Sequence, residues 1–88
     1  MDKVDKHGAI CNALHEIYIK KNHDYGDSFG RTFKELGIIS AVTRLYDKMN
    51  RIVSITKTSN QVKDESLRDT LLDLANYAIM TVIEMGDE

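Results

Sequence analysis

The chain has 88 residues, of which 42% are hydrophobic and 30% charged, and its formal net charge is −2. This size and composition favour one globular domain, residues 1–88, and exclude a disordered chain. The charge balance gives no field that would attract a nucleic acid polymer, and the missing apolar span and signal core exclude a membrane partner and predict a cytoplasmic location.

The first expected element is a helix from about His7 to Lys21. Residues 1–6 precede it, are mostly charged, and are expected to fray. Its apolar positions recur at helical spacing, at Ile10, Leu14, Ile17 and Tyr18. Cys11 is the only cysteine, so it cannot form an internal disulfide, and we expect it to be a small core residue.

Residues 21–30 read Lys-Asn-His-Asp-Tyr-Gly-Asp-Ser-Phe-Gly and predict a loop. Glycine, Asn, Asp and Ser are the residues that turns prefer. The same stretch holds a histidine, two carboxylates and two aromatic rings, which is more than a connector needs, and binding groups often gather on such loops. Ser28 is expected to cap a short helix over Phe29–Leu36, which Gly37 would end.

A second long helix is expected from Ile38 to about Thr56. Its seam residues alternate four and three apart, a spacing typical of helix packing, at Ile38, Val42, Leu45, Met49, Ile52 and Thr56. Residues 57–63 are polar and aperiodic, which predicts a loop. Asp64 or Ser66 is expected to cap the last helix, and Gly86 to end it.

The last helix, which would reach Met85, carries two apolar rows. One row holds Leu67, Leu71, Leu74, Ala78, Val82 and Met85, and the other holds Leu72, Ala75, Ile79 and Ile83. A surface helix needs one row, and a domain this short cannot cover two, so we expect a homo-oligomer. Asp69, Asp73 and Asn76 form a polar stripe on this helix. The fold class is therefore all-α, with three long helices and one short helix.

Charged residues on these elements suggest a phosphorylated ligand. The acids are Glu16, Asp24, Asp27, Asp47, Asp69 and Asp73, and the bases are Arg31, Arg44, Lys48 and Arg51. Carboxylates suit Mg²⁺, and clustered Arg and Lys suit phosphate. A nucleotide base could stack on Tyr25 or Phe29. The alternative is that these charges are the solvated faces of amphipathic helices.

Three blocks of the sequence resemble a known family. They are Lys21-Asn22-His23-Asp24-Tyr25-Gly26-Asp27-Ser28-Phe29, then Asp47-Lys48-x-x-Arg51, then Asp64-Glu65-Ser66 with Asp69-Thr-Leu-Leu-Asp73-Leu-Ala-Asn76-Tyr77-Ala. Over residues 15–85 the chain resembles the first nucleotide modification associated domain family. These small proteins are common in phages and prophages and are similar to MazG-like all-α nucleotide pyrophosphohydrolases. For a phage protein, the expected location is the host cytoplasm.

The resemblance implies a MazG-like helical bundle completed by oligomerisation, with a site for a nucleotide. The charged and aromatic residues together with the resemblance suggest these ligand-binding residues: Asn22, His23, Asp24, Tyr25, Phe29, Arg31, Arg44, Lys48, Arg51, Asn76 and Tyr77. They suggest Glu16, Asp47, Asp69 and Asp73 for Mg²⁺, of which Asp69 and Asp73 would be catalytic. MazG enzymes have a Glu-x-x-Asp pair where this chain has Thr70 and Asp73. That departure removes one expected acid.

Three hypotheses follow for function. The first is Mg²⁺-dependent pyrophosphohydrolysis of a (deoxy)nucleoside triphosphate. The second is a non-catalytic phage protein that sequesters a nucleotide signal and so counters host defence. The third is a structural helical oligomer, in which Asp73 and Asn76 only fix helix register.

Overall fold

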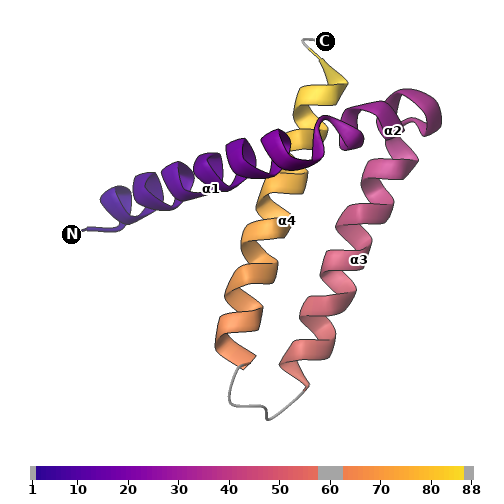
Figure 1. The fold of residues 1–88 in the computed structure, drawn as a ribbon. Coiled ribbons are helices and arrows are strands. Elements are labelled where there is room, and N and C mark those ends of the chain that lie inside the picture. The colour runs from indigo at the N-terminus through magenta and orange to yellow at the C-terminus, as the bar shows by residue number, and fades with distance from the viewer. Residues whose placement is uncertain (1, 58–62, 87–88) are drawn as a thin grey trace.

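The computed structural model describes residues 2–57 and 63–86, and within these ranges it contains four helices and no strand. α3 (Ile38–Thr56) and α4 (Lys63–Met85) form an antiparallel hairpin (Figure 1). α1 (Lys3–Tyr25) crosses α4, and α2 (Ser28–Leu36) packs at the beginning of α3. The all-α prediction, with three long helices and one short helix, is confirmed.

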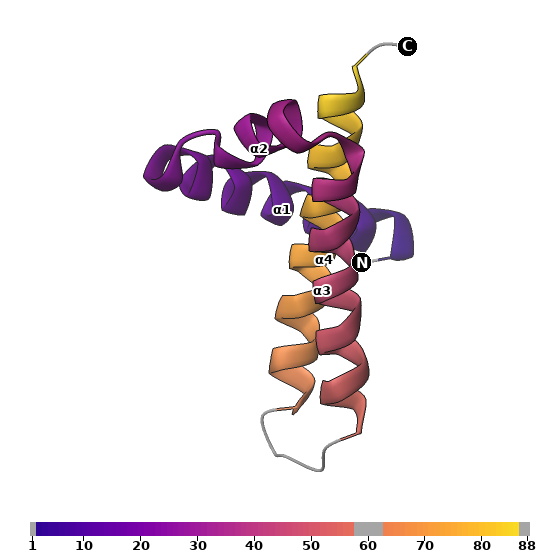
Figure 2. The same cartoon turned by 90° about the vertical axis from the view of Figure 1, so that its right-hand side faces the viewer.

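α1 lies crosswise to the hairpin, and its N-terminal half projects beyond it (Figures 1 and 2). Every residue from Lys3 to Asn12 is exposed, and Leu14 is the first buried residue of the helix. Cys11 is also exposed, so its predicted place in the core is wrong. α1 is therefore only half packed within one chain.

Both ends of α1 extend past their predicted bounds. Asp2 caps the helix, because its Oδ1 accepts a hydrogen bond from the Asp5 amide at 2.8 Å, so Lys3 to Lys6 are helical rather than frayed. At the other end the helix runs through residues 22–25. Gly26, at φ +67°, then ends it. The predicted loop over residues 21–30 therefore shrinks to Gly26 and Asp27.

The caps of the other helices partly agree with the predictions. Asp27, not Ser28, caps α2, and its Oδ1 accepts the Gly30 amide at 3.2 Å. A Cβ on the buried Gly30 would collide with the Asp27 carboxylate, so this close approach needs glycine. Gly37 and Gly86 follow α2 and α4 at positive φ, as predicted. α4 begins at Lys63, so Asp64 and Ser66 lie inside it, and most of the predicted 57–63 loop lies outside the described residues.

The packed face of α3 agrees with the predicted seam only at Leu45 and Ile52. Ala41 is fully buried, and Leu45, Lys48 and Ile52 are partly buried. Val42 and Met49, both expected in the seam, are exposed. The sequence pattern identified a helix but assigned too much of its surface to the contact with α4.

Candidate functional site

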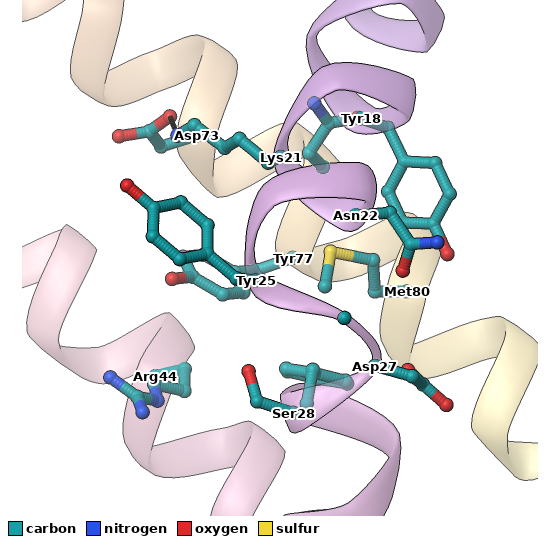
Figure 3. A pocket seen from close by; sticks show the side chains of 13 residues that line it. Tyr18, Lys21, Asn22, Tyr25, Asp27, Ser28, Arg44, Asp73, Tyr77 and Met80 are labelled. Carbon is teal, nitrogen blue, oxygen red and sulfur yellow. Dashed lines mark hydrogen bonds and ion pairs between the residues drawn. The ribbon is translucent and has the colours of Figure 1, made fainter.

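A hollow of about 140 Å³ lies where the C-terminal end of α1, the start of α2 and the middle of α4 meet. Its lining residues are Tyr18, Lys21, Asn22, Tyr25, Gly26, Asp27, Ser28, Phe29, Arg44, Asp73, Asn76, Tyr77 and Met80. Figure 3 shows Lys21 and Asp73 at one end of the view and Arg44 with Ser28 at the other. The hollow thus combines aromatic rings with cationic and amide groups.

Asp73 is held between two lysines from different helices. Its Oδ1 lies 3.4 Å from Lys21 Nζ of α1, and its Oδ2 lies 3.5 Å from Lys48 Nζ of α3. Each carboxylate oxygen therefore faces its own ammonium group. An ammonium group has three N–H donors, so each lysine keeps donors for another anion beside its contact with Asp73.

Aromatic rings line the hollow beside this cluster. The Phe29 and Tyr77 rings are tilted by 34° with centroids 5.8 Å apart, and Lys48 Nζ lies 5.8 Å from the Tyr77 centroid. Both spacings are within the ranges of aromatic pairs and cation–π contacts. Tyr25 is 72% exposed, so its ring lies at the rim. These rings offer flat apolar faces next to positive charge.

One hydrogen bond fixes the back of the hollow. Asn76 Nδ2 donates to the Leu14 carbonyl of α1 at 3.1 Å. Leu14 is buried, so this polar contact joins α1 to α4 at the point where they cross. It places Lys21, two turns further along α1, opposite Asp73.

The structure brings together most of the predicted ligand-binding residues. Those that line the hollow are Asn22, Tyr25, Phe29, Arg44, Asn76 and Tyr77, and Lys48 reaches it through Asp73. His23 and Asp24 lie outside it and contact each other at 3.4 Å, with the His23 side chain well exposed. Arg31 does not line the hollow, although its Nη1 lies 3.8 Å from where a Cβ of Gly26 would sit.

Arg51 has a structural contact instead of a place in the hollow. Its Nε donates to Thr70 Oγ1 at 3.2 Å, and Thr70 in turn donates to the Ser66 carbonyl at 2.8 Å. Thr70 is 2% exposed. Thr70, which stands where MazG enzymes have an acid, is therefore a buried residue whose hydroxyl group joins α3 to α4.

The described residues do not assemble the expected Mg²⁺ site. No three His, Cys, Asp or Glu side chains among them come close enough to hold a metal ion. Glu16, Asp47 and Asp69 are exposed on their helices, while Asp73 is occupied by its lysines and Asp27 by its cap. A divalent ion needs several convergent oxygen ligands, so the donor set of one chain does not fit Mg²⁺.

Sequence reasoning missed three residues of the hollow, namely Tyr18, Lys21 and Met80. Tyr18, Lys21, Asn22 and Tyr25 occupy positions i, i+3, i+4 and i+7, which lie on one helix face. This signal was obscured because the helix was expected to end at Lys21. Met80 continues the stripe of Asp73 and Asn76 by four residues and could have been found by extending it.

No curated protein and no solved structure matches the chain. Among the described helices, none combines the length and apolar character that a membrane crossing requires. The family model described as Nucleotide modification associated domain 1 matches residues 21–85, which include most of the hollow's lining residues. The chain therefore belongs to the Nucleotide modification associated domain 1 family.

Proposed function

We propose that the hollow binds a phosphorylated nucleotide and retains it without cleaving it. The observation that carries this proposal is the position of Asp73 between Lys21 and Lys48, rather than among other carboxylates. A nucleotide-related role also agrees with the family of the chain.

The cations supply the phosphate contacts in this proposal. Lys21, Lys48 and Arg44 outnumber the two carboxylates at the hollow, Asp73 and Asp27. A phosphate entering beside Asp73 would accept hydrogen bonds from both lysines, and the Arg44 guanidinium offers a second, planar donor set. Asp73 keeps the two ammonium groups close together before the ligand arrives, which lowers the cost of ordering them.

The aromatic residues supply the base contacts. Phe29 and Tyr77 present fixed ring faces, while Tyr25 at the rim can turn over an entering base. Stacking of a base on an aromatic ring contributes on the order of 1–3 kcal/mol and tolerates any base. The arrangement therefore favours a nucleotide as a class over a simple phosphate.

Pyrophosphohydrolysis is the competing hypothesis. Asp69 and Asp73 lie one turn apart on α4, but only Asp73 lines the hollow. A two-metal hydrolysis would need further acids to converge on Asp73, and its lysine partners would have to leave it. Holding a nucleotide without cleaving it requires neither change, so this arrangement of side chains favours a sequestering protein. Countering a host nucleotide signal is one role that such retention would serve.

The first prediction concerns the lysine pair. Lys21→Met and Lys48→Met should each weaken nucleotide binding by about tenfold or more, because each removes a charge-assisted phosphate contact. Isothermal titration with purine and pyrimidine nucleoside mono-, di- and triphosphates, and with pyrophosphate, measures the change. Lys20→Met is the matched control, since Lys20 is exposed on α1 and does not line the hollow.

The control variant should bind like the wild type. If all three variants weaken binding equally, the effect is one of net charge and the hollow is not the site. If pyrophosphate binds as tightly as the nucleotides, the aromatic rings have no role in recognition.

A further inference from the structure

The packed face of α1 continues past the point where its own chain covers it. Leu14 of this face is buried against α4, and Ile17 and Tyr18 are partly buried. One and more turns earlier the same face carries Ile10 and Val4, which are 41% and 80% exposed. No described part of the chain lies over that half of the helix (Figure 1).

By itself, this projecting half would be a marginal helix. Residues 3–13 form about three turns, and isolated helices shorter than about 12–15 residues are marginal in water. Gly8, in the middle of this segment, makes the helix less favourable by about 1 kcal/mol relative to alanine. Its position opens onto empty space, with no atom within 4 Å of an added Cβ. The segment therefore needs a partner surface.

An apolar groove lies at the crossing of α1 and α4, next to the projecting half. We call it the corner groove; it has a volume of about 210 Å³ and is lined by Cys11, Leu14, His15, Tyr18, Asn76, Ile79, Met80 and Ile83. Beyond it, Val82 of α4 is 66% exposed. Each chain thus carries a projecting half-helix, with Val4 and Ile10 exposed, and an apolar groove beside it.

The exposed area is larger than that of a typical folded monomer of this mass. A folded chain of 10.0 kDa is expected to expose about 5,200 Å². This chain exposes 6993 Å², which is about 1,800 Å² more. A standard interface covers only about 800 Å² on each partner. The excess is therefore in the range of an obligate contact between subunits.

We propose that a second copy of this chain covers the projecting half of α1 and the corner groove, so that each copy inserts its half-helix at the other's groove. A two-fold contact would cover the projecting half-helix and the corner groove of both copies at once. A different partner protein would need two separate surfaces that fit them. Charge also permits it, since Asp2 and Asp5 on this segment are matched by Lys3 and Lys6. The proposal does not depend on the proposed ligand.

Sedimentation of the full chain at micromolar concentration tests the proposal. The wild type should have a mass of two chains or more. Ile10→Asp should give single chains, because it places a charge in the contact. Ile39→Asp is the control: Ile39 is an exposed isoleucine of α3, away from the corner groove, and this variant should remain assembled.

Cys11 provides a second readout that locates the contact. It is the only cysteine and lines the corner groove, so its reaction with a thiol reagent should slow several-fold as the wild-type concentration rises. In Ile10→Asp the reaction rate should not depend on concentration. A wild-type mass of one chain at all concentrations overturns the proposal. So does assembly in which Cys11 stays equally reactive, since the contact would then lie elsewhere.

Discussion

At the scale of single residues, the role of each charge depends on what its side chain contacts. Arg44 and Arg51 lie two turns apart on the same helix and were both expected to bind phosphate. Arg44 lines the hollow, whereas Arg51 donates its Nε to the buried hydroxyl of Thr70. The two arginines should therefore respond differently to the same substitution.

We expect Arg51→Ala to lower the free energy of unfolding by about 1 kcal/mol and to leave nucleotide affinity unchanged, because it removes a hydrogen bond between α3 and α4. Arg44→Ala should weaken nucleotide affinity and leave the free energy of unfolding nearly unchanged, since an exposed charge contributes little to stability. Urea denaturation and titration calorimetry on both variants measure the two quantities. If Arg51→Ala lost affinity without losing stability, Arg51 would contact the ligand and the structural role given to it here would be wrong.

At the scale of elements, the junction between α1 and α2 explains where sequence reasoning succeeded and failed. The ends of α2 and α4 at Gly37 and Gly86 were predictable, because a helix commonly ends at a glycine with positive φ. The end of α1 was not. Asn22, His23 and Asp24 are weak helix formers, so local preference favoured a loop. In the structure the helix continues to Tyr25, and Lys21 and Tyr25 line the hollow from this last part of α1.

The same reasoning applies to the candidate site. The sequence supplied Tyr25, Phe29, Arg44 and Tyr77 as binding residues, because their chemical types suit a nucleotide. It could not show that Asp73 meets lysines instead of acids, since Lys21 and Asp73 are 52 positions apart and only the tertiary fold determines their contact. Metal binding was inferred from the number of acidic residues, and that number does not determine whether their carboxylates meet at one site.

Asp27 should determine how well α2 is held at the hollow. Replacing it with Ala removes the acceptor for the Gly30 amide, and loss of such a cap lowers stability by about 1 kcal/mol. Asp27→Asn keeps an oxygen acceptor and should stay within a few tenths of a kcal/mol of the wild type, roughly. Thermal or urea unfolding of the two variants tests this. Equal losses in both would mean that the charge, not the cap, is what stabilises the junction.

At the scale of the whole molecule, one chain leaves much of its apolar surface exposed. Leu14 and Ala41 are the buried apolar residues of its described part, and many apolar side chains of α3 and α4 remain exposed. Its hollow, at about 140 Å³, is smaller than the roughly 300–1,000 Å³ of common ligand pockets. Tyr18, Asn76 and Met80 line both the hollow and the corner groove. A subunit placed in the groove would therefore lie directly behind the hollow.

The central claim is that the hollow retains a nucleotide intact. It is tested by incubating stoichiometric protein with a mixed nucleotide pool and Mg²⁺, separating the bound fraction, denaturing it with heat and chromatographing the supernatant. The account predicts a nucleotide that is withheld from solution until heating and is then released unchanged, and that Lys21→Met does not withhold. A nucleoside monophosphate together with pyrophosphate in the supernatant would contradict it, and so would a pool from which nothing is withheld.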